Sequence, residues 1–326
     1  MTLIRLRCGQ VGAVLLFWAT LVSVSAIFAG ESALHVGQHV LARRSDVALY
    51  EGNRAVQRVP TGMMLDVLSI EGRWLWTGRG WVRNIDVVPL EEAISYFDDA
   101  LRQRPSTFAL VNRARAHLEL REYDLAIADC SQAIELEAGF APAYCVRGRA
   151  YVKRGNHDQA LSDLSRALEL DANHSLAYLG RIQVWLERRD WDKVIHDATE
   201  AVRVDPKLAL ALAARGRALL QKGEHERAIA DFDSAIAINP HLCSAWNNRG
   251  NARFKKGEYE RAIADYTAAL EFAPNAQVHL NRAIAWQRLG VQDKAEQDFG
   301  QTIELDPKLV PSNLRSAQLE PGDQAM

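Results

Sequence analysis

Arginine and aspartate recur together through the C-terminal two thirds of the chain. Six arginines follow one another at intervals of 34 residues, the last at 33, and each has an aspartate sixteen residues later. A guanidinium can bind a carboxylate through two parallel hydrogen bonds, so each pair could form a bidentate ion pair. The pairs are Arg113 with Asp129, Arg147 with Asp163, Arg181 with Asp197, Arg215 with Asp231, Arg249 with Asp265 and Arg282 with Asp298.

We predict that these pairs are structural and partly buried. Each arginine follows a large apolar position by three residues and therefore shares its helix face. Removing one partner of a buried pair costs about 3–5 kcal/mol. The alternative is a solvated row of charges, in which each pair contributes about 0–1 kcal/mol. The sequence leaves open whether each aspartate meets the arginine before it, the arginine after it, or both.

Catalytic motifs are absent from the sequence. There is no HExxH, GxSxG or GxxxxGK[ST] segment, and the nine histidines are scattered. His157 and His225 fall at the repeat position that Tyr123, Trp191 and Tyr259 occupy elsewhere, which favours packing over metal ligation. We therefore predict no catalytic residues, no metal site, no cofactor and no enzymatic activity.

Bulk composition excludes two classes of protein. The 326 residues include 39 basic and 41 acidic side chains, for a net charge of −2, whereas a nucleic-acid binder needs a clustered basic excess. We expect no nucleic-acid partner. Without the first thirty residues the cysteines are Cys130, Cys145 and Cys243, an odd number without a CxxC pair, which argues against a disulfide framework.

Residues 1–30 have the composition of an export signal. Arg5 and Arg7 precede an uncharged run from Val11 to Gly30 that ends in small-residue cleavage sites. The run is also just long enough to span a bilayer, so a cleaved signal peptide and an uncleaved N-terminal membrane anchor both remain open. Either places the body of the chain outside the cytoplasm. We predict an exported protein of the periplasm or cell envelope.

Residues 31–89 predict a small all-β domain. Short β-rich runs are separated by turn-forming groups such as Pro-Thr-Gly and Glu-Gly-Arg, a spacing typical of a small barrel. The runs are HVLA from His39, VALY from Val47, AVQRV from Ala55, MLDVLSI from Met64, WLWT from Trp74 and GWVRN from Gly80.

The order of these runs resembles the bacterial SH3-like family. The matching elements are Gly62, Trp74 to Trp76, and the closing Gly80-Trp81-Val82. The resemblance implies an SH3-like β-barrel, and such domains often bind peptides or cell-wall material through aromatic residues. Strand alternation puts Trp74 and Trp76 on one face and Leu75 on the other. We predict that the tryptophans fill the barrel interior, because so small a barrel needs large side chains; an exposed, binding role is the alternative.

From Leu90 onward the pattern changes to helices with an internal repeat. Each unit predicts two amphipathic helices of about fourteen residues, which cannot bury their apolar faces alone. Small residues beside the arginines let the helix backbones approach closely, and glycines after the first helix fit a left-handed turn. These glycines are Gly155, Gly223, Gly257 and Gly290, and four units close with Pro206, Pro240, Pro274 and Pro307.

This pattern resembles the tetratricopeptide repeat (TPR). A half unit from Leu90, which would cap the stack against the barrel, precedes six full units that begin near Thr107, Ala141, Ser175, Ala209, Cys243 and Ala276. The unit from Ser175 departs most, because Ile182, Val194 and Ala198 replace the usual residues and Arg189 replaces glycine. The resemblance implies a multidomain chain in which an all-α TPR superhelix, an α-solenoid, spans residues 90–312. We expect residues 313–326 to form a disordered tail.

The resemblance also implies a concave groove lined by the first helices of the units. The groove would carry a broken basic stripe over an apolar floor, which suits an extended peptide with acidic groups or a free carboxylate. The alternative is that these arginines only keep the surface soluble. The lysines of the Lys-Asn-Asn clamp of chaperone-binding members are not where the family puts them. The candidate ligand-binding residues are Arg115, Arg149, Arg217, Asn247, Asn251 and Phe254.

Two functions are consistent with these patterns. The first is a non-catalytic scaffold or adaptor, exported or membrane-anchored, that binds a partner protein or peptide in the TPR groove. The alternative is a cell-envelope binding protein in which the SH3-like domain holds wall polymer or peptide.

Overall fold

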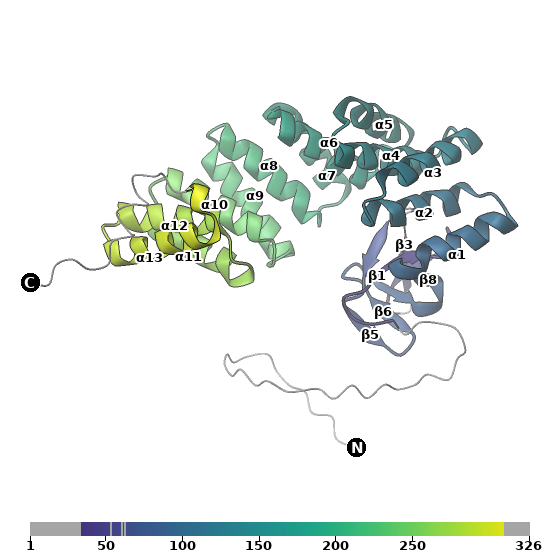
Figure 1. Ribbon diagram of the computed structural model, residues 1–326, viewed down its shortest axis with the longest axis horizontal. Coiled ribbons are helices and arrows are strands. Elements are labelled where there is room, and N and C mark those ends of the chain that lie inside the picture. The colour runs from purple at the N-terminus through teal and green to yellow at the C-terminus, as the bar shows by residue number, and fades with distance from the viewer. Residues whose placement is uncertain (1–33, 53, 60, 62, 310–326) are drawn as a thin grey trace, which may run out of the picture.

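The computed structural model describes residues 34–309 except 53, 60 and 62. Within these residues a small β domain is followed by thirteen α-helices that stack side by side along a curve (Figure 1). No helix in this part of the chain is long and apolar enough to cross a membrane. The export signal or anchor predicted over residues 1–30 and the tail predicted over residues 313–326 lie outside the described residues.

The β domain consists of short antiparallel strands in two sheets, with the orders β4-β1-β8 and β3-β2-β7-β6-β5. The run from Met64 to Ile70 forms two strands instead of the one that was expected, and β8 was not predicted. The strands are β1 (His39–Ala42), β2 (Ala48–Glu51), β3 (Arg54–Arg58), β4 (Met64–Asp66), β5 (Ser69–Glu71), β6 (Trp74–Trp76), β7 (Trp81–Arg83) and β8 (Val87–Pro89).

The prediction that the tryptophans fill the β-domain interior is wrong. Leu75 and Val82 are 1% and 0% exposed, whereas Trp74, Trp76 and Trp81 are half-buried on the opposite face. Aliphatic side chains from both sheets already fill the interior, which leaves the indoles outside. They include Val40, Val47, Leu49, Leu65 and Val67.

The prediction of paired helices is confirmed. Each unit contributes one helix of 13 or 14 residues and a second of 14 residues. The helices are α1 (Leu90–Gln103), α2 (Thr107–Glu119), α3 (Tyr123–Leu136), α4 (Ala141–Arg154), α5 (His157–Leu170), α6 (Ser175–Arg188), α7 (Trp191–Val204), α8 (Ala209–Gln221), α9 (His225–Ile238), α10 (Cys243–Lys255), α11 (Tyr259–Phe272), α12 (Ala276–Arg288) and α13 (Gln292–Leu305).

The left-handed turns between paired helices are also confirmed. The four glycines that were expected to end a first helix have φ between 76° and 82°. Arg121 and Arg189 take the same conformation with φ of 64° and 56°, in the two units that have arginine where the other four have glycine. An L-residue pays a steric penalty in this region, so the turns of these two units are held by the helices on either side.

Helix α1 joins the β domain to the stack. Phe97 of α1 is 1% exposed and belongs to one apolar cluster with Leu41 and Val88 of the β domain and Ala109 of α2. A second link is the ion pair between Arg79, in the turn after β6, and Asp205 at the end of α7, 3.1 Å apart. The half unit therefore lies between the β domain and the first full unit, as predicted.

Within a unit, a small residue of the first helix packs against a large residue of the second. A Cβ atom on Gly250 would lie 2.6 Å from Cε1 of Tyr266, a distance that real structures do not tolerate. The unit of α6 and α7 exchanges the sizes, because Ile182 packs in one cluster with Ala198. In this unit the large residue therefore stands on the first helix and the small residue on the second. The exchange keeps the total volume at the interface, so the packing is conserved.

We expect Gly250→Ala to destabilise the protein by about 1–3 kcal/mol, because the added methyl group overpacks the Tyr266 ring. Chemical denaturation followed by circular dichroism measures the change. Gly139→Ala is the matched control, since a Cβ atom there meets nothing within 4 Å and should leave stability unchanged. Equal midpoints for the two variants would contradict the close approach of α10 and α11.

Candidate functional site

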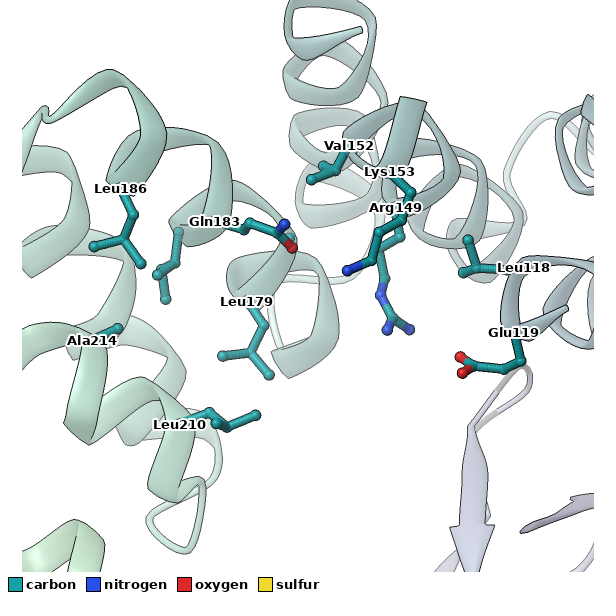
Figure 2. Close-up of a pocket in the computed structure, with 12 residues that line it drawn as sticks. Leu118, Glu119, Arg149, Val152, Lys153, Leu179, Gln183, Leu186, Leu210 and Ala214 are labelled. Carbon is teal, nitrogen blue, oxygen red and sulfur yellow. The ribbon is translucent and has the colours of Figure 1, made fainter. Parts of the chain in front are cut away.

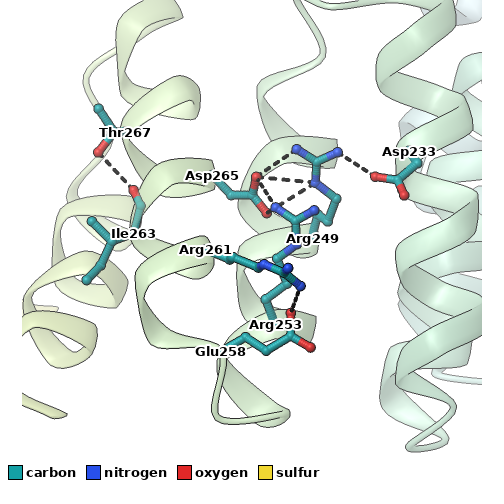
Figure 3. A network of polar contacts seen from close by, with 8 residues as sticks. All are labelled: Asp233, Arg249, Arg253, Glu258, Arg261, Ile263, Asp265 and Thr267. Atoms are coloured by element: carbon teal, nitrogen blue, oxygen red, sulfur yellow. Dashed lines mark hydrogen bonds and ion pairs between the residues drawn. The ribbon is translucent and has the colours of Figure 1, made fainter. Parts of the chain in front are cut away.

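Each aspartate of the series pairs with the arginine of its own unit. The six aspartates are 1–7% exposed. In a representative pair, Arg215 donates from Nε to Asp231 Oδ2 at 2.8 Å and from Nη2 to Asp231 Oδ1 at 2.7 Å. Figure 3 shows the same arrangement around Asp265, which also accepts from Arg253. The prediction of structural, partly buried pairs is confirmed, and the question of which arginine each aspartate meets is answered.

The remaining arginine nitrogen reaches back to the preceding unit. Arg147 Nη1 donates to Ser131 Oγ at 3.0 Å, and Arg249 Nη1 bonds Asp233 of the helix before it (Figure 3). The six acceptors are Asp98, Ser131, Ser165, Thr199, Asp233 and Thr267. Five of them recur at intervals of 34 residues, so the sequence held a signal for this contact that the analysis of pairs missed.

The electrostatics of these pairs favour the charged forms. The hydrogen bonds that Arg113, Arg147 and Arg215 donate to their aspartates raise the pKa of these guanidinium groups above the usual value. A buried carboxylate needs such a partner, because an isolated charge in the interior is strongly unfavourable. The network therefore fixes the helices and is not available to a ligand.

A groove runs along the first helices of the units. One hollow along it, of about 320 Å³, is lined by α2, α4, α6 and α8, and Figure 2 shows the side chains that face it. Leu179 and Leu186 lie on one side, and Arg149 and Lys153 point into the open space beside them (Figure 2). We call this hollow the groove pocket. Its lining is Leu118, Glu119, Arg149, Val152, Lys153, Leu179, Gly180, Ile182, Gln183, Leu186, Leu210 and Ala214.

Only some of the predicted ligand-binding residues come together there. Arg149 lines the groove pocket, and Arg115 is buried next to it, 7% exposed, close enough for the two charges to repel. Arg217 is exposed and lies outside the pocket lining. Leu210, which the prediction omitted, lines the pocket and is 55% exposed. The sequence did contain a signal for Leu210. It is an apolar residue at the second position of its unit, and this position of a repeat is expected to face the groove.

The other predicted residues lie further along the stack. Asn281 donates to Asn247 Oδ1 at 3.0 Å and to Asn251 Oδ1 at 3.1 Å, so the asparagines satisfy one another. Phe254 packs edge-on against Tyr259, with ring centroids 5.2 Å apart. The predicted set therefore does not form a single site.

The outer face of the β domain carries a cluster of aromatic side chains. Trp76 and Trp81 face each other across β6 and β7 with centroids 5.4 Å apart, and Tyr50 meets Trp74 edge-on at 5.3 Å. All four are half-buried, so part of each ring is open to solvent. We call these four residues the aromatic face.

Within residues 34–309, apart from the three undescribed positions, no group of histidine, cysteine, aspartate and glutamate could hold a metal ion. The described cysteines Cys130, Cys145 and Cys243 are free thiols, and the first two are buried.

Protein-family models match much of the helical region. Models described as tetratricopeptide repeat match residues 90–140, 141–174 and 243–275, and a model described as TPR repeat matches residues 216–257. No curated protein sequence matches the chain.

Solved structures of similar fold include three that differ in size. The Cut9–Hcn1 hetero-tetramer of APC/C aligns with a TM-score of 0.62 and 20% identity over 71% of this chain and 46% of that one. The pilF protein of Pseudomonas aeruginosa aligns with a TM-score of 0.58 and 16% identity over 70% of this chain and 99% of that one. YrrB, described as a TPR protein with an unusual peptide-binding site, aligns with a TM-score of 0.49 and 20% identity over 58% of this chain and 98% of that one. The chain spans less than half of the first of these, and at such identities the likeness concerns the fold.

We expect a double-mutant cycle on Arg215 and Asp231 to show strong coupling. Arg215→Met leaves Asp231 buried without its partner and should cost up to about 3–5 kcal/mol. Asp231→Leu should cost less, because the Arg215 side chain is 21% exposed and keeps some contact with water. The double variant should be more stable than the sum of the single effects predicts, since two apolar residues replace the pair.

Urea denaturation measures the three variants. The control is the same cycle on Arg166 and Glu169, whose side chains are 49% and 63% exposed, where coupling should stay under about 1 kcal/mol. Additive costs at Arg215 and Asp231 would show that the pair does not act as a unit.

Proposed function

We propose that this chain, a tetratricopeptide repeat protein, is a non-catalytic platform that binds an extended segment of a partner protein along its groove. The observation that carries the proposal is the groove pocket, which brings open apolar and charged side chains together on four consecutive first helices. Repeat stacks expose such continuous surfaces for contact with partners.

The composition of the pocket supports a peptide as occupant. Leu210 is 55% exposed, and a partner side chain that covers it would gain from the apolar area removed from water. Arg149 and Lys153 outnumber the one carboxylate of the lining, Glu119, which favours a segment that carries acidic groups. The hollow is large enough for one or two side chains and is lined by four successive first helices, which suits an extended chain.

A second candidate function rests on the aromatic face. We propose as the alternative that the β domain is SH3-like and holds cell-wall polymer or peptide on Tyr50, Trp74, Trp76 and Trp81. Partly open aromatic rings offer large, rigid contact area to sugar rings or peptides. Their position outside the core, with aliphatic residues inside, supports this alternative more than the sequence did.

Photo-crosslinking of the full-length protein in its own cells distinguishes the two functions. We expect benzoylphenylalanine in place of Leu210 to capture partner protein, because this residue lines the groove pocket. Benzoylphenylalanine in place of Leu125 is the control, since Leu125 is 51% exposed but lies on α3, outside that lining. A third variant carries benzoylphenylalanine in place of Trp76 of the aromatic face. Capture of a partner by this variant alone would favour the aromatic face as the binding site. Equal capture by the variants at Leu210 and Leu125 would contradict binding in the groove.

We further propose that the protein works outside the cytoplasmic membrane. The support is the sequence of residues 1–30, in which Arg5 and Arg7 precede the apolar run. A C-terminal alkaline phosphatase fusion should be active in bacterial cells, because this reporter folds only after export. Removal of residues 2–30 should abolish that activity. Equal phosphatase activity of the two fusions would contradict export, and the mass of the exported chain tells a cleaved signal from a retained anchor.

A further inference from the structure

We propose that a second hollow, formed by α1, α2 and α3, binds an aromatic side chain, tyrosine or tryptophan, that a partner protein places over the guanidinium group of Arg113. We call it the ring hollow. It has a volume of about 380 Å³ and shares no residue with the groove pocket, so the proposal does not depend on the function of the groove. Its three helices pack together at the end of the stack that adjoins the β domain (Figure 1). Its lining is Leu101, Pro105, Leu110, Arg113, Gln132, Glu135 and Leu136.

Three other units carry an aromatic ring over the equivalent arginine. The ring belongs to the residue three positions before the arginine. The distance from the guanidinium carbon to the ring centroid is 5.7 Å for Arg147, 5.9 Å for Arg181 and 4.7 Å for Arg249. At such distances the negative face of the ring attracts the cation. The three rings are those of Tyr144, Tyr178 and Trp246.

The first unit has a leucine at the position of the ring. Leu110 precedes Arg113 by three residues and is 3% exposed, packed among the apolar residues of α2, α3 and α4. The fourth unit also has a leucine at this position, Leu212, and the sixth has His279, whose ring bonds Asp298. Leucine is smaller than tyrosine or tryptophan and offers no ring face to the guanidinium. A hollow beside Leu110 is therefore the space that a ring would fill.

The neighbours of the rings in the second and third units mark the same space. A side-chain hydrogen bond joins Tyr144 to Arg166. Burial, followed by the charge of Glu200, raises the pKa of Tyr178, so these two side chains also lie close together. Arg166 and Glu200 hold the repeat position of Gln132, which lines the ring hollow. The second and third units thus fill with their own ring the volume that the first unit leaves open.

The bonds of Arg113 leave its flat face available. Its Nε and Nη2 atoms donate to Asp129, and Nη1 donates to Asp98. These hydrogen bonds lie in the plane of the guanidinium group, and an aromatic ring stacks on the face of that plane. The Arg113 side chain is 20% exposed, so a ring can reach it from solvent without breaking an ion pair.

The rest of the lining suits a ring that carries one polar atom. Leu101, Pro105 and Leu136 supply apolar surface, and Leu136 is 56% exposed, so a ring that covers it removes apolar area from water. Gln132 and Glu135 are exposed and offer oxygen atoms to the O–H of tyrosine or the N–H of tryptophan. None of the described residues that line the hollow is itself aromatic.

Disulfide trapping on the full-length Leu136→Cys protein tests the proposal. The new thiol at the rim exchanges with three disulfide fragments that end in phenol, indole or cyclohexane, in competition with a reductant. We expect the phenol and indole fragments to be retained about two- to fivefold more than the cyclohexane fragment, which has similar bulk but no negative ring face. Digestion and mass spectrometry assign each fragment to position 136, because Cys243 is partly exposed and can also react.

Three further variants make the test specific. Leu110→Tyr, added to Leu136→Cys, supplies the missing ring from within and should remove the preference for aromatic fragments. Leu212→Tyr is the matched control, because it makes the same change at the same repeat position of α8, outside the lining, and should leave the preference unchanged. Leu305→Cys controls the rim: Leu305 holds the repeat position of Leu136 in α13 and is 47% exposed, so its thiol should retain the three fragments equally.

Equal retention of phenol and cyclohexane fragments at position 136 would overturn the proposal, whether or not Leu110→Tyr folds. A preference for aromatic fragments that persists in a folded Leu110→Tyr variant would overturn it as well. A preference that appears only after removal of residues 2–30 would assign the hollow to Phe17, Trp18 or Phe28 of that segment and would exclude a partner as the occupant. Capture at Leu210 is measured separately, so the function proposed for the groove stands or fails independently of these results.

Discussion

The stack depends on one buried aspartate in the second helix of every unit. Such a carboxylate is tolerated only where a guanidinium meets it, so its position dictates where the first helix must stand. The arginine makes two bonds within its unit and a third to the helix before it, as Arg147 does with Asp163 and Ser131. A slip of either helix by one turn would strand a buried charge. The pairs therefore contribute more to register than to net stability.

A second constraint, the fit of side-chain volumes, involves the residue that follows each member of the charged pair. Gly250 follows Arg249, and Tyr266 follows Asp265, so the charged pair and the small-to-large contact share the same two helices. The ion pair sets which residues face each other, and the volumes set how close the helices come. The unit with Ile182 and Ala198 keeps the ion pair of Arg181 and Asp197 while it exchanges the volumes. The two constraints are thus separable, and the charge pair is the one that does not vary among the six units.

The sequence revealed what is periodic and missed what depends on neighbours. The helix pairs, left-handed turns and ion pairs repeat with the units, so their spacing alone identifies them. Direction of pairing could not be read, because antiparallel helices bring each aspartate level with an arginine on either side. For β6, the alternation of residues predicted two faces of the strand but not which of them is buried. The aliphatic residues of the other strands decide this, because they fill the interior of the β domain. Arg115 and Arg217 share a repeat position yet differ in burial. Ala116, next to Arg115, belongs to a cluster with Leu41 and Val88 of the β domain, so the first unit has surroundings that a repeat argument cannot supply.

Arg113 and Arg115 show how one helix serves two purposes. Arg113 points to the interface between helices, where Asp98 and Asp129 satisfy it completely. Arg115 lies on the groove side, where the fold provides one carboxylate and leaves two nitrogens without an acceptor. Because the arginine–aspartate pairs hold the helices, residues on the groove side are free to differ between units. Successive equivalent positions hold arginine, arginine, glutamine, arginine and asparagine. A regular framework can thus present an irregular surface.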